Sequence, residues 1–254
     1  MNRIARLCVV ATWMSSFLAG CSDGDAKNPA AGSGGEGGGP GSTCAEQLAG
    51  PLDPAALIDD FEDGDSQLLK VANRSGSWWL ATDMTAGTTT PHGDQPLLPE
   101  RVVGGRCESS RALRVTGQGF TDWGVSISGT FRWEAQAEPM DASRYQGVTF
   151  WARVGEQNTS VVRVQFQDVN THPSGGVCST ERGSPDECYN GFGTALPALG
   201  EQWRHYKIAF ADLAQREFGL RRDALQVSGL YGIEIGLDAN SVFDLWLDDF
   251  AFYE

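Results

Sequence analysis

Apolar residues alternate with tryptophan and polar residues along several short segments of this 254-residue chain. In residues 148–154 and 161–167 one side of the alternation is apolar, and the other carries tryptophan, arginine, threonine and glutamine. Flat aromatic rings stack on sugar rings, while amide, guanidinium and carboxylate groups hydrogen-bond to hydroxyls. The pattern therefore favours a glycan ligand. The candidate ligand-binding residues are Trp151, Arg153, Arg163, Gln165, Gln167, Trp203, His205 and Glu234. Two explanations without a ligand remain open, a solvated sheet face with isolated aromatic residues or a second layer of the core.

Recognisable catalytic motifs are absent from the sequence. Residues 124–128 only approximate the G-x-S-x-G motif of hydrolases, and neither a phosphate-binding loop nor a dinucleotide fingerprint occurs. Glycoside hydrolases use pairs of carboxylates, but no spacing pairs any two of Glu134, Glu138, Glu156 and Glu234. We expect a binding protein rather than an enzyme. A small polysaccharide hydrolase on the same scaffold is the alternative.

Acidic residues gather at both ends of the part of the chain that we expect to fold. Five carboxylates lie within residues 59–65, and Asp248 and Asp249 lie near the C-terminus. The first cluster does not fit an EF-hand loop, because Phe61 stands at its third position and the downstream glutamate is missing. Hard oxygen ligands from distant segments suit Ca²⁺, whereas a solvent-exposed Asp-Gly turn needs no metal. Both interpretations stay open.

Four of the six cysteines remain after the N-terminal segment described below, an even number that predicts two disulfides in an exported protein. Cys178 and Cys188 bracket a nine-residue polar loop, so we predict that they pair. That leaves Cys44 to pair with Cys107. Zinc is disfavoured, since no C-x-x-C spacing occurs and no histidine lies within a few residues of either pair.

The N-terminal segment predicts export and lipidation. Arg3 and Arg6 precede an apolar run, which ends in the sequence Leu-Ala-Gly-Cys at residues 18–21. This sequence resembles the lipobox of bacterial lipoproteins, which implies cleavage after residue 20 and acylation of Cys21. Residues 22–43 contain eight glycines and almost nothing apolar, which indicates a flexible tether. The predicted organisation is a signal peptide (1–20), a lipidated cysteine with its linker (21–43) and one domain (44–254). We expect anchoring in the bacterial cell envelope, with the outer membrane favoured over the inner one.

The composition of the chain predicts a β protein. It has 32 glycines, 11 prolines and 8 tryptophans, and a net charge of −14 that argues against a nucleic-acid partner. Only residues 211–218 have a short helical pattern. Segments without intervening long helices indicate antiparallel sheets, hence a β-sandwich or jelly roll with one short helix. The predicted strands are 56–61, 78–83, 112–116, 124–133, 147–154, 160–168, 203–210, 230–237 and 243–253.

The order of several motifs resembles that of known binding modules. They are LIDDFEDG at 57–64, SRALRV at 110–115, WGV at 123–125, YQGVTFWAR at 145–153, WRHYKIAFADL at 203–213 and LWLDDF at 245–250. Together they resemble carbohydrate-binding modules of the galactose-binding-domain-like jelly-roll superfamily, with family 11 the nearest. This resemblance implies a β-sandwich whose concave sheet binds a glycan. It also implies a structural Ca²⁺ held by the first and last strands, here by Asp60, Glu62, Asp65, Asp248 and Asp249. Residues 172–193 stand out as an added loop.

These observations predict a monomeric, surface-anchored, non-catalytic carbohydrate-binding lipoprotein. Its partners would be a polysaccharide and, through the lipid, a membrane. The acidic net charge disfavours sulfated or uronic glycans and leaves a neutral polysaccharide as the expected ligand. A structural or adhesive lipoprotein is the further alternative, and it would present a flat apolar patch to a protein partner.

Overall fold

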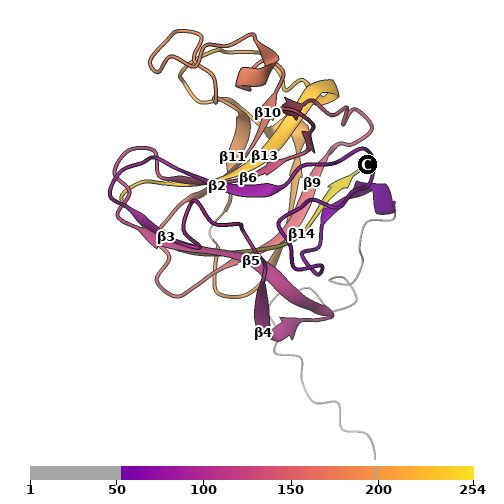
Figure 1. Ribbon diagram of the computed structural model, residues 1–254, viewed down its shortest axis with the longest axis vertical. Helices are drawn as coiled ribbons and strands as arrows, with labels where there is room; N and C mark the ends of the chain where they lie inside the picture. Colours follow the sequence, from indigo (N-terminus) through magenta and orange to yellow (C-terminus); the bar gives the residue numbers. More distant parts are fainter. Residues whose placement is uncertain (1–52, 198) are drawn as a thin grey trace, which may run out of the picture. The chain divides into compact units, whose positions relative to one another are not determined.

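Strands provide most of the regular structure in the computed structural model, which describes residues 53–197 and 199–254. All of these residues belong to one unit of the chain, Pro40–Glu254. They form two antiparallel sheets whose apolar faces share one core (Figure 1). The predicted fold class, an antiparallel β-sandwich of jelly-roll type, is confirmed. Its basis is the alternation of side chains, which gives each strand one face toward the core and one away from it.

The first sheet contains seven strands. Five follow the order β12-β9-β14-β5-β3, while β1 pairs with β14 and β4 pairs with β5. The C-terminal strand β14 therefore lies between β9 and β5, at the centre of the sheet. The strands are β1 (Leu57–Asp59), β3 (Thr88–Thr90), β4 (Glu100–Arg106), β5 (Ser109–Gln118), β9 (Gly147–Val154), β12 (Arg204–Ala209) and β14 (Val242–Tyr253).

The second sheet contains five strands in the order β11-β10-β13-β6-β2. They are β2 (Trp78–Thr82), β6 (Val125–Thr130), β10 (Val162–Asp168), β11 (Phe192–Ala195) and β13 (Leu230–Leu237). A small ribbon pairs β7 (Arg132–Trp133) with β8 (Ala137–Glu138). The helical turns are η1 (Pro54–Ala56), η2 (Pro173–Gly175), η3 (Phe210–Asp212) and η4 (Val227–Gly229).

Aromatic rings join the two sheets in the core. Trp78 of β2 contacts Phe250 of β14 with 5.0 Å between ring centroids, and Phe250 stacks on Phe150 of β9 at 4.8 Å. The indole nitrogen of Trp78 donates to the Asp59 carboxylate over 2.8 Å. Burial raises the pKa of Asp59 to about 7, although hydrogen bonds from the Phe61 amide and Trp78 oppose the shift. A titratable group is thus built into the interior.

Most predicted strands form, and the differences have local causes. β9 and β13 have the predicted bounds, whereas the predicted strand 124–133 breaks at Phe131 into β6 and β7. The chain at 211–218 is not an α-helix: η3 covers its start, and Ala214 then pairs with Gly193 of β11. β3, β4 and β11 were not predicted, because they lack a clear alternation of apolar and polar residues.

The predicted signal peptide, linker, lipidation site Cys21 and disulfide partner Cys44 lie outside the described residues. Their assignments therefore stay predictions. Within residues 53–197 and 199–254, no helix is long and apolar enough to cross a membrane.

Candidate functional site

The eight candidate ligand-binding residues lie on two different surfaces. Trp151 and Arg153 belong to β9, and Trp203 and His205 precede or belong to β12, so these four lie on the outer face of the first sheet. Arg163, Gln165 and Gln167 belong to β10, and Glu234 belongs to β13, so this group lies on the outer face of the second sheet. One site that uses all eight residues is excluded, because the core separates the two faces.

On the first sheet, the tryptophan rings are already in contact with arginines. The Arg106 guanidinium carbon lies 4.8 Å from the ring centroid of Trp151 and 5.8 Å from that of Trp203. Arg153 lies over Trp203 at 5.2 Å and over Trp246 at 4.4 Å. Arginine and tryptophan side chains therefore alternate in a ladder, each contact a cation–π interaction.

Because of these contacts, the Trp151 ring has no surface open to a sugar. Trp151 is 4% exposed, and His205 covers it further at 5.0 Å between ring centroids. The position of Trp151 on the outer face agrees with the alternation. Its burial does not agree with the predicted role as an exposed stacking platform. The reason is β4, which turns back from β5 and brings the buried Arg106 over this face. Val102 of β4 packs there against Trp246.

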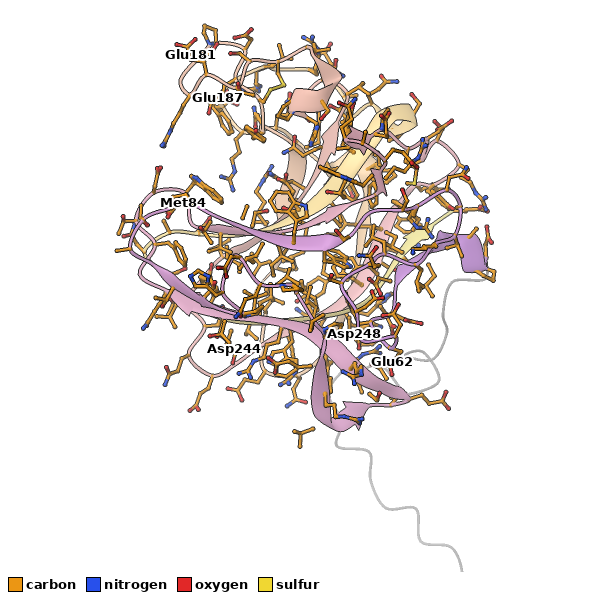
Figure 2. The ribbon with its side chains drawn as sticks, viewed as in Figure 1. Glu62, Met84, Glu181, Glu187, Asp244 and Asp248 are labelled. Carbon is orange, nitrogen blue, oxygen red and sulfur yellow. A yellow bond between two sulfur atoms is a disulfide. The ribbon has the colours of Figure 1, made fainter. Side chains whose placement is uncertain are left out.

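The acidic residues proposed as calcium ligands are held by protein donors instead. Arg106 Nε donates to Asp248 over 3.0 Å, and Arg106 also pairs with Asp249. The carboxylate of Glu62 accepts hydrogen bonds from the Ser110 hydroxyl at 2.6 Å and from the Ser110 and Arg111 amides at 2.8 Å. Figure 2 shows Glu62 and Asp248 close together, and the Ser109 hydroxyl bonds to both.

The other two predicted calcium ligands lie in turns of their own. Asp60 accepts from the Glu62 amide over 3.2 Å, and Asp65 accepts from the Gln67 amide over 2.6 Å. In the part of the chain that the structure describes, no group of three or more histidines, cysteines or carboxylates is arranged to hold a metal ion. The Arg106 guanidinium supplies the positive charge between Asp248 and Asp249, so these residues do not fit a calcium site.

The outer face of the second sheet carries a hydrogen-bonded network around Glu234. The Gln165 side-chain amide donates to the Glu234 carboxylate over 2.5 Å, and the Gln167 amide donates to the same oxygen over 3.2 Å. Arg163 Nε donates to Gln165 over 3.4 Å, and its terminal nitrogen donates to the Ala214 carbonyl over 2.7 Å. Burial raises the pKa of Glu234, while the two glutamine donors oppose the shift. These contacts fix the orientation of each group before any ligand arrives.

Strand register extends this network into a row that ends at a tryptophan. Gln165 of β10 is opposite Glu234 of β13, which is opposite Ser128 of β6, which is opposite Trp79 of β2. Three strand spacings give the row a length of about 14 Å. Trp79 is 45% exposed, and its indole nitrogen donates to the Thr130 hydroxyl over 3.0 Å. The ring is thus oriented by the sheet while much of it faces solvent.

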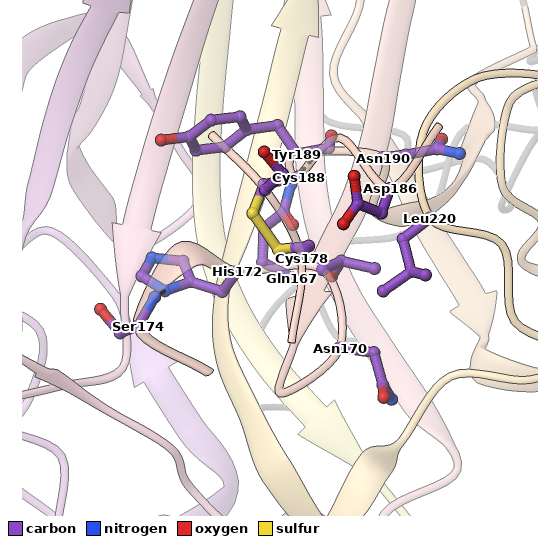
Figure 3. The surroundings of a disulfide bond; sticks show 12 residues. Gln167, Asn170, His172, Ser174, Cys178, Asp186, Cys188, Tyr189, Asn190 and Leu220 are labelled. Carbon is purple, nitrogen blue, oxygen red and sulfur yellow. Dashed lines mark hydrogen bonds between the residues drawn. A yellow bond between two sulfur atoms is a disulfide. The ribbon is translucent and has the colours of Figure 1, made fainter. Parts of the chain in front are cut away.

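A second exposed ring, Tyr189, lies at the β10 end of these residues, and from here on the row includes Tyr189. The Gln167 amide that donates to Glu234 also donates to the Tyr189 carbonyl over 3.2 Å. Tyr189 is 51% exposed, and both burial and the negative charge of Glu234 raise its pKa. Figure 3 shows its ring extending from the backbone that follows Cys188. The predicted disulfide Cys178–Cys188 is confirmed directly beside it.

Glycines flank the carboxylate in this row. Gly232 and Gly236 lie two residues to either side of Glu234 on β13, on the same face. A Cβ at Gly232 would lie 2.5 Å from the Gly129 carbonyl oxygen, whereas a Cβ at Gly236 would meet only the Arg163 carbonyl oxygen at 3.8 Å. Glu234 therefore stands clear of side chains on its own strand.

The row contains one carboxylate, which bears on the hydrolase alternative. Glu134 and Glu138 lie at the β7–β8 ribbon, and Glu156 lines a cavity of about 390 Å³ at the first sheet. A neighbouring cavity of about 440 Å³ shares Thr88, Gln118 and Val242 with it. No candidate ligand-binding residue lines either cavity. The row offers a hydrogen-bonding surface rather than a pair of catalytic acids.

The sequence pattern missed three members of this row: Trp79, Ser128 and Tyr189. A usable signal existed for Trp79. In a strand, neighbouring residues point to opposite faces, so the pair Trp78-Trp79 must place one ring outside the core. Tyr189 had no such signal, because it lies in a loop without periodicity.

No protein-family model matches the chain, and no curated protein matches it. Solved structures do show similarity. A family 11 carbohydrate-binding module from Clostridium thermocellum, in complex with a β-1,3-1,4-mixed-linked tetrasaccharide, has a TM-score of 0.48 and 13% identity over 78% of this chain and 94% of its own. The family 30 carbohydrate-binding module of the cellulosomal cellulase Cel9D-Cel44B of Clostridium thermocellum has a TM-score of 0.47 and 17% identity, covering 78% of this chain and 96% of its own. Both are carbohydrate-binding modules, the class that the motifs resemble.

Proposed function

We propose that this protein binds a neutral polysaccharide on the outer face of the second sheet, without catalysing a reaction. The observation that carries the proposal is the row from Tyr189 to Trp79, in which two exposed rings flank an ordered network of amide, carboxylate and hydroxyl groups. The rings would stack on sugar faces, and the partly exposed Glu234 and Gln165 would hydrogen-bond to sugar hydroxyls, while the buried Gln167 holds Glu234 in place.

Charge supports a neutral ligand. Arg163 and Glu234 contribute opposite charges to the row, and the chain as a whole carries a net charge of −14. An anionic glycan would approach this surface against the field of the protein. A neutral glycan requires only the directed hydrogen bonds that the network holds ready.

Tryptophan substitution tests the proposal on the full-length mature protein. After a glycan array identifies a neutral ligand, Trp79→Ala should weaken its binding by about 1–3 kcal/mol, as measured by calorimetry, because a stacking ring is lost. Trp133→Ala is the matched control, since Trp133 is 54% exposed but lies on β7 outside the row. Equal binding by wild type and Trp79→Ala, or an array with no glycan ligand, would refute the proposal.

We also propose that Cys21 anchors the protein to the cell envelope, with the outer membrane as the expected location. The support is the lipobox-like sequence at residues 18–21 and the glycine-rich segment behind it. Several acyl chains on one residue hold a protein firmly to a bilayer. Cys21→Ser should release the protein from the membrane fraction, and mass spectrometry of an unmodified wild-type N-terminus would contradict the anchor.

A further inference from the structure

A disulfide-closed loop lies directly beside the proposed binding row. We call residues 178–188 the strap. The Cys178–Cys188 disulfide joins its two ends, and the Cys188 amide donates to the Ser179 carbonyl over 2.7 Å. The Ser179 amide donates to the Asp186 carbonyl over 2.8 Å, so the chain on both sides of the disulfide is paired.

The base of the strap is fixed to neighbouring loops. The Tyr189 amide donates to the Thr171 carbonyl over 2.9 Å, and the Leu220 amide donates to the Glu187 carbonyl over 3.0 Å. The buried side chain of Asn190 donates to the Arg216 carbonyl and accepts from the Arg216 amide, both over 2.9 Å. These hydrogen bonds fix the base of the strap relative to the neighbouring loops.

The tip of the strap is tied to the far side of the second sheet. Arg182 makes two hydrogen bonds to the Asp122 carboxylate, at 2.6 and 2.7 Å, and Asp122 lies in the loop that leads into β6. Asp83, after β2, holds that loop by accepting from the Asp122 amide over 2.9 Å. Figure 2 shows the strap, marked by Glu181 and Glu187, and the loop that carries Met84 beside Asp83.

Tyr189 is the first residue after the strap, and its backbone conformation is unfavourable on its own. Its φ is +67°, in the left-handed region that bulky residues other than glycine rarely adopt. Such a conformation persists only where the surrounding contacts impose it. The contacts that do so here are the disulfide at Cys188, the bond to Thr171 and the bond from Gln167.

We propose that the strap is a positioning device for Tyr189, so that glycan affinity depends on the Cys178–Cys188 disulfide. This inference rests on the proposed function of the row. With the disulfide closed, the ring of Tyr189 is held at the end of the row beside Glu234. With the disulfide open, Tyr189 leaves the left-handed conformation and its ring no longer contributes to binding. Cys178 and Arg182, which are not members of the row, thereby affect the affinity.

A thermodynamic cycle on the mature full-length protein tests this coupling. Tyr189→Ala should weaken binding of the array-selected glycan roughly 10-fold. Replacing both strap cysteines, Cys178→Ser with Cys188→Ser, should weaken it by a similar factor. Combining the three substitutions should weaken it no further, because both changes remove the same ring. Additive losses, or an unchanged affinity without the disulfide, would overturn the inference.

Trp79 supplies the control for the cycle. Trp79→Ala and the cysteine replacement should have multiplicative effects on the dissociation constant, since Trp79 is oriented by Thr130 and not by the strap. A general loss of folding would instead couple the disulfide to both rings. If wild type binds no glycan at all, the proposed function fails; if it binds and only the coupling is missing, the positioning role fails.

Arg182→Ala gives a second variant that keeps the disulfide. It should weaken binding in the wild-type background and have no effect in the Tyr189→Ala background. Arg144→Ala removes a comparable exposed ion pair, with Glu254, that has no contact with the strap, and should leave affinity unchanged in both. An Arg182→Ala effect that persists without Tyr189 would contradict the proposed role of the strap.

Discussion

On the outer face of the first sheet, tryptophan rings lie between guanidinium groups, whereas on the outer face of the second sheet Trp79 and Tyr189 remain about half exposed. Both faces are built from the same types of residue. They differ in what lies above the rings, because β4 covers those of the first face with Arg106 and Val102, while Trp79 and Tyr189 on the second face keep about half of their surface exposed. An aromatic residue on the outer face of a sheet thus stabilises the fold where other side chains cover it, and it is free to bind a ligand where it stays exposed.

Removing one tryptophan from each face tests this difference most directly. Trp151→Ala should lower the free energy of unfolding by about 3–5 kcal/mol, because a buried ring and its contact with Arg106 are lost. Trp79→Ala should lower it by less than about 1 kcal/mol, since the ring is exposed. Urea unfolding of both variants measures the difference. Equal losses would show that the two faces are not distinct.

A smaller effect is expected from changing the arginine that covers the first face. Arg106→Lys keeps the charge but loses the planar fork that pairs with Asp248 and Asp249 and stacks on Trp151. The free energy of unfolding should fall by about 1.5–3 kcal/mol. Arg144→Lys is the control, because Arg144 pairs with Asp53 and Glu254 at the surface and its replacement should leave unfolding unchanged. A stable Arg106→Lys protein would contradict the role of Arg106.

The interior between the two faces should respond to pH. The pKa of Asp59 is about 7 in the folded protein and near 3.8 when unfolded, so between pH 4 and 7 the folded state holds a proton that the unfolded state has lost. The contribution of Asp59 to stability is therefore largest below pH 4 and falls as pH rises to 7, by at most about 1.4 kcal/mol per pH unit. Burial also raises the pKa of Asp248 to about 7, which adds a slope of the same sign.

Unfolding measured across this pH range separates the two contributions. Asp59→Asn should reduce the slope, whereas Trp78→Phe removes the hydrogen-bond donor but keeps the carboxyl and should retain the slope. A slope that Asp59→Asn leaves unchanged would show that Asp59 does not carry the proton.

The alternation of residues was sufficient to predict the sandwich and the inward face of single strands, because the inward rows of β9 and β10 follow a strict period of two. It was not sufficient to assign strands to sheets. β9 and β10 are consecutive in the chain but belong to different sheets, so residues that share a pattern, such as Trp151 and Gln165, lie on opposite sides of the core. Pairing depends on contacts between distant segments, which a local pattern does not contain.

The cover of the first face was also beyond the sequence pattern. β4 contains Gly104 and Gly105 at positive φ and has no regular alternation, so nothing in its residues indicated a strand that folds over Trp151. The same strand also decides the surroundings of the residues expected to bind calcium. The acids at 59–65 and 248–249 are close in space where Glu62 meets Asp248 through Ser109, but Arg106 of β4 supplies their counter-charge.

Gly236, two residues from Glu234, is a position at which the surface beside the row can change. It lies on the open face opposite Arg163 and Ser126, and a Cβ built there would touch only one backbone oxygen, at 3.8 Å. A new side chain at this position would project beside Glu234 without displacing a neighbour, and it would replace a residue that is entropically unfavourable in a strand. Selection or protein engineering thus has a vacant position at which one substitution can add a contact for a different sugar while the scaffold stays as it is.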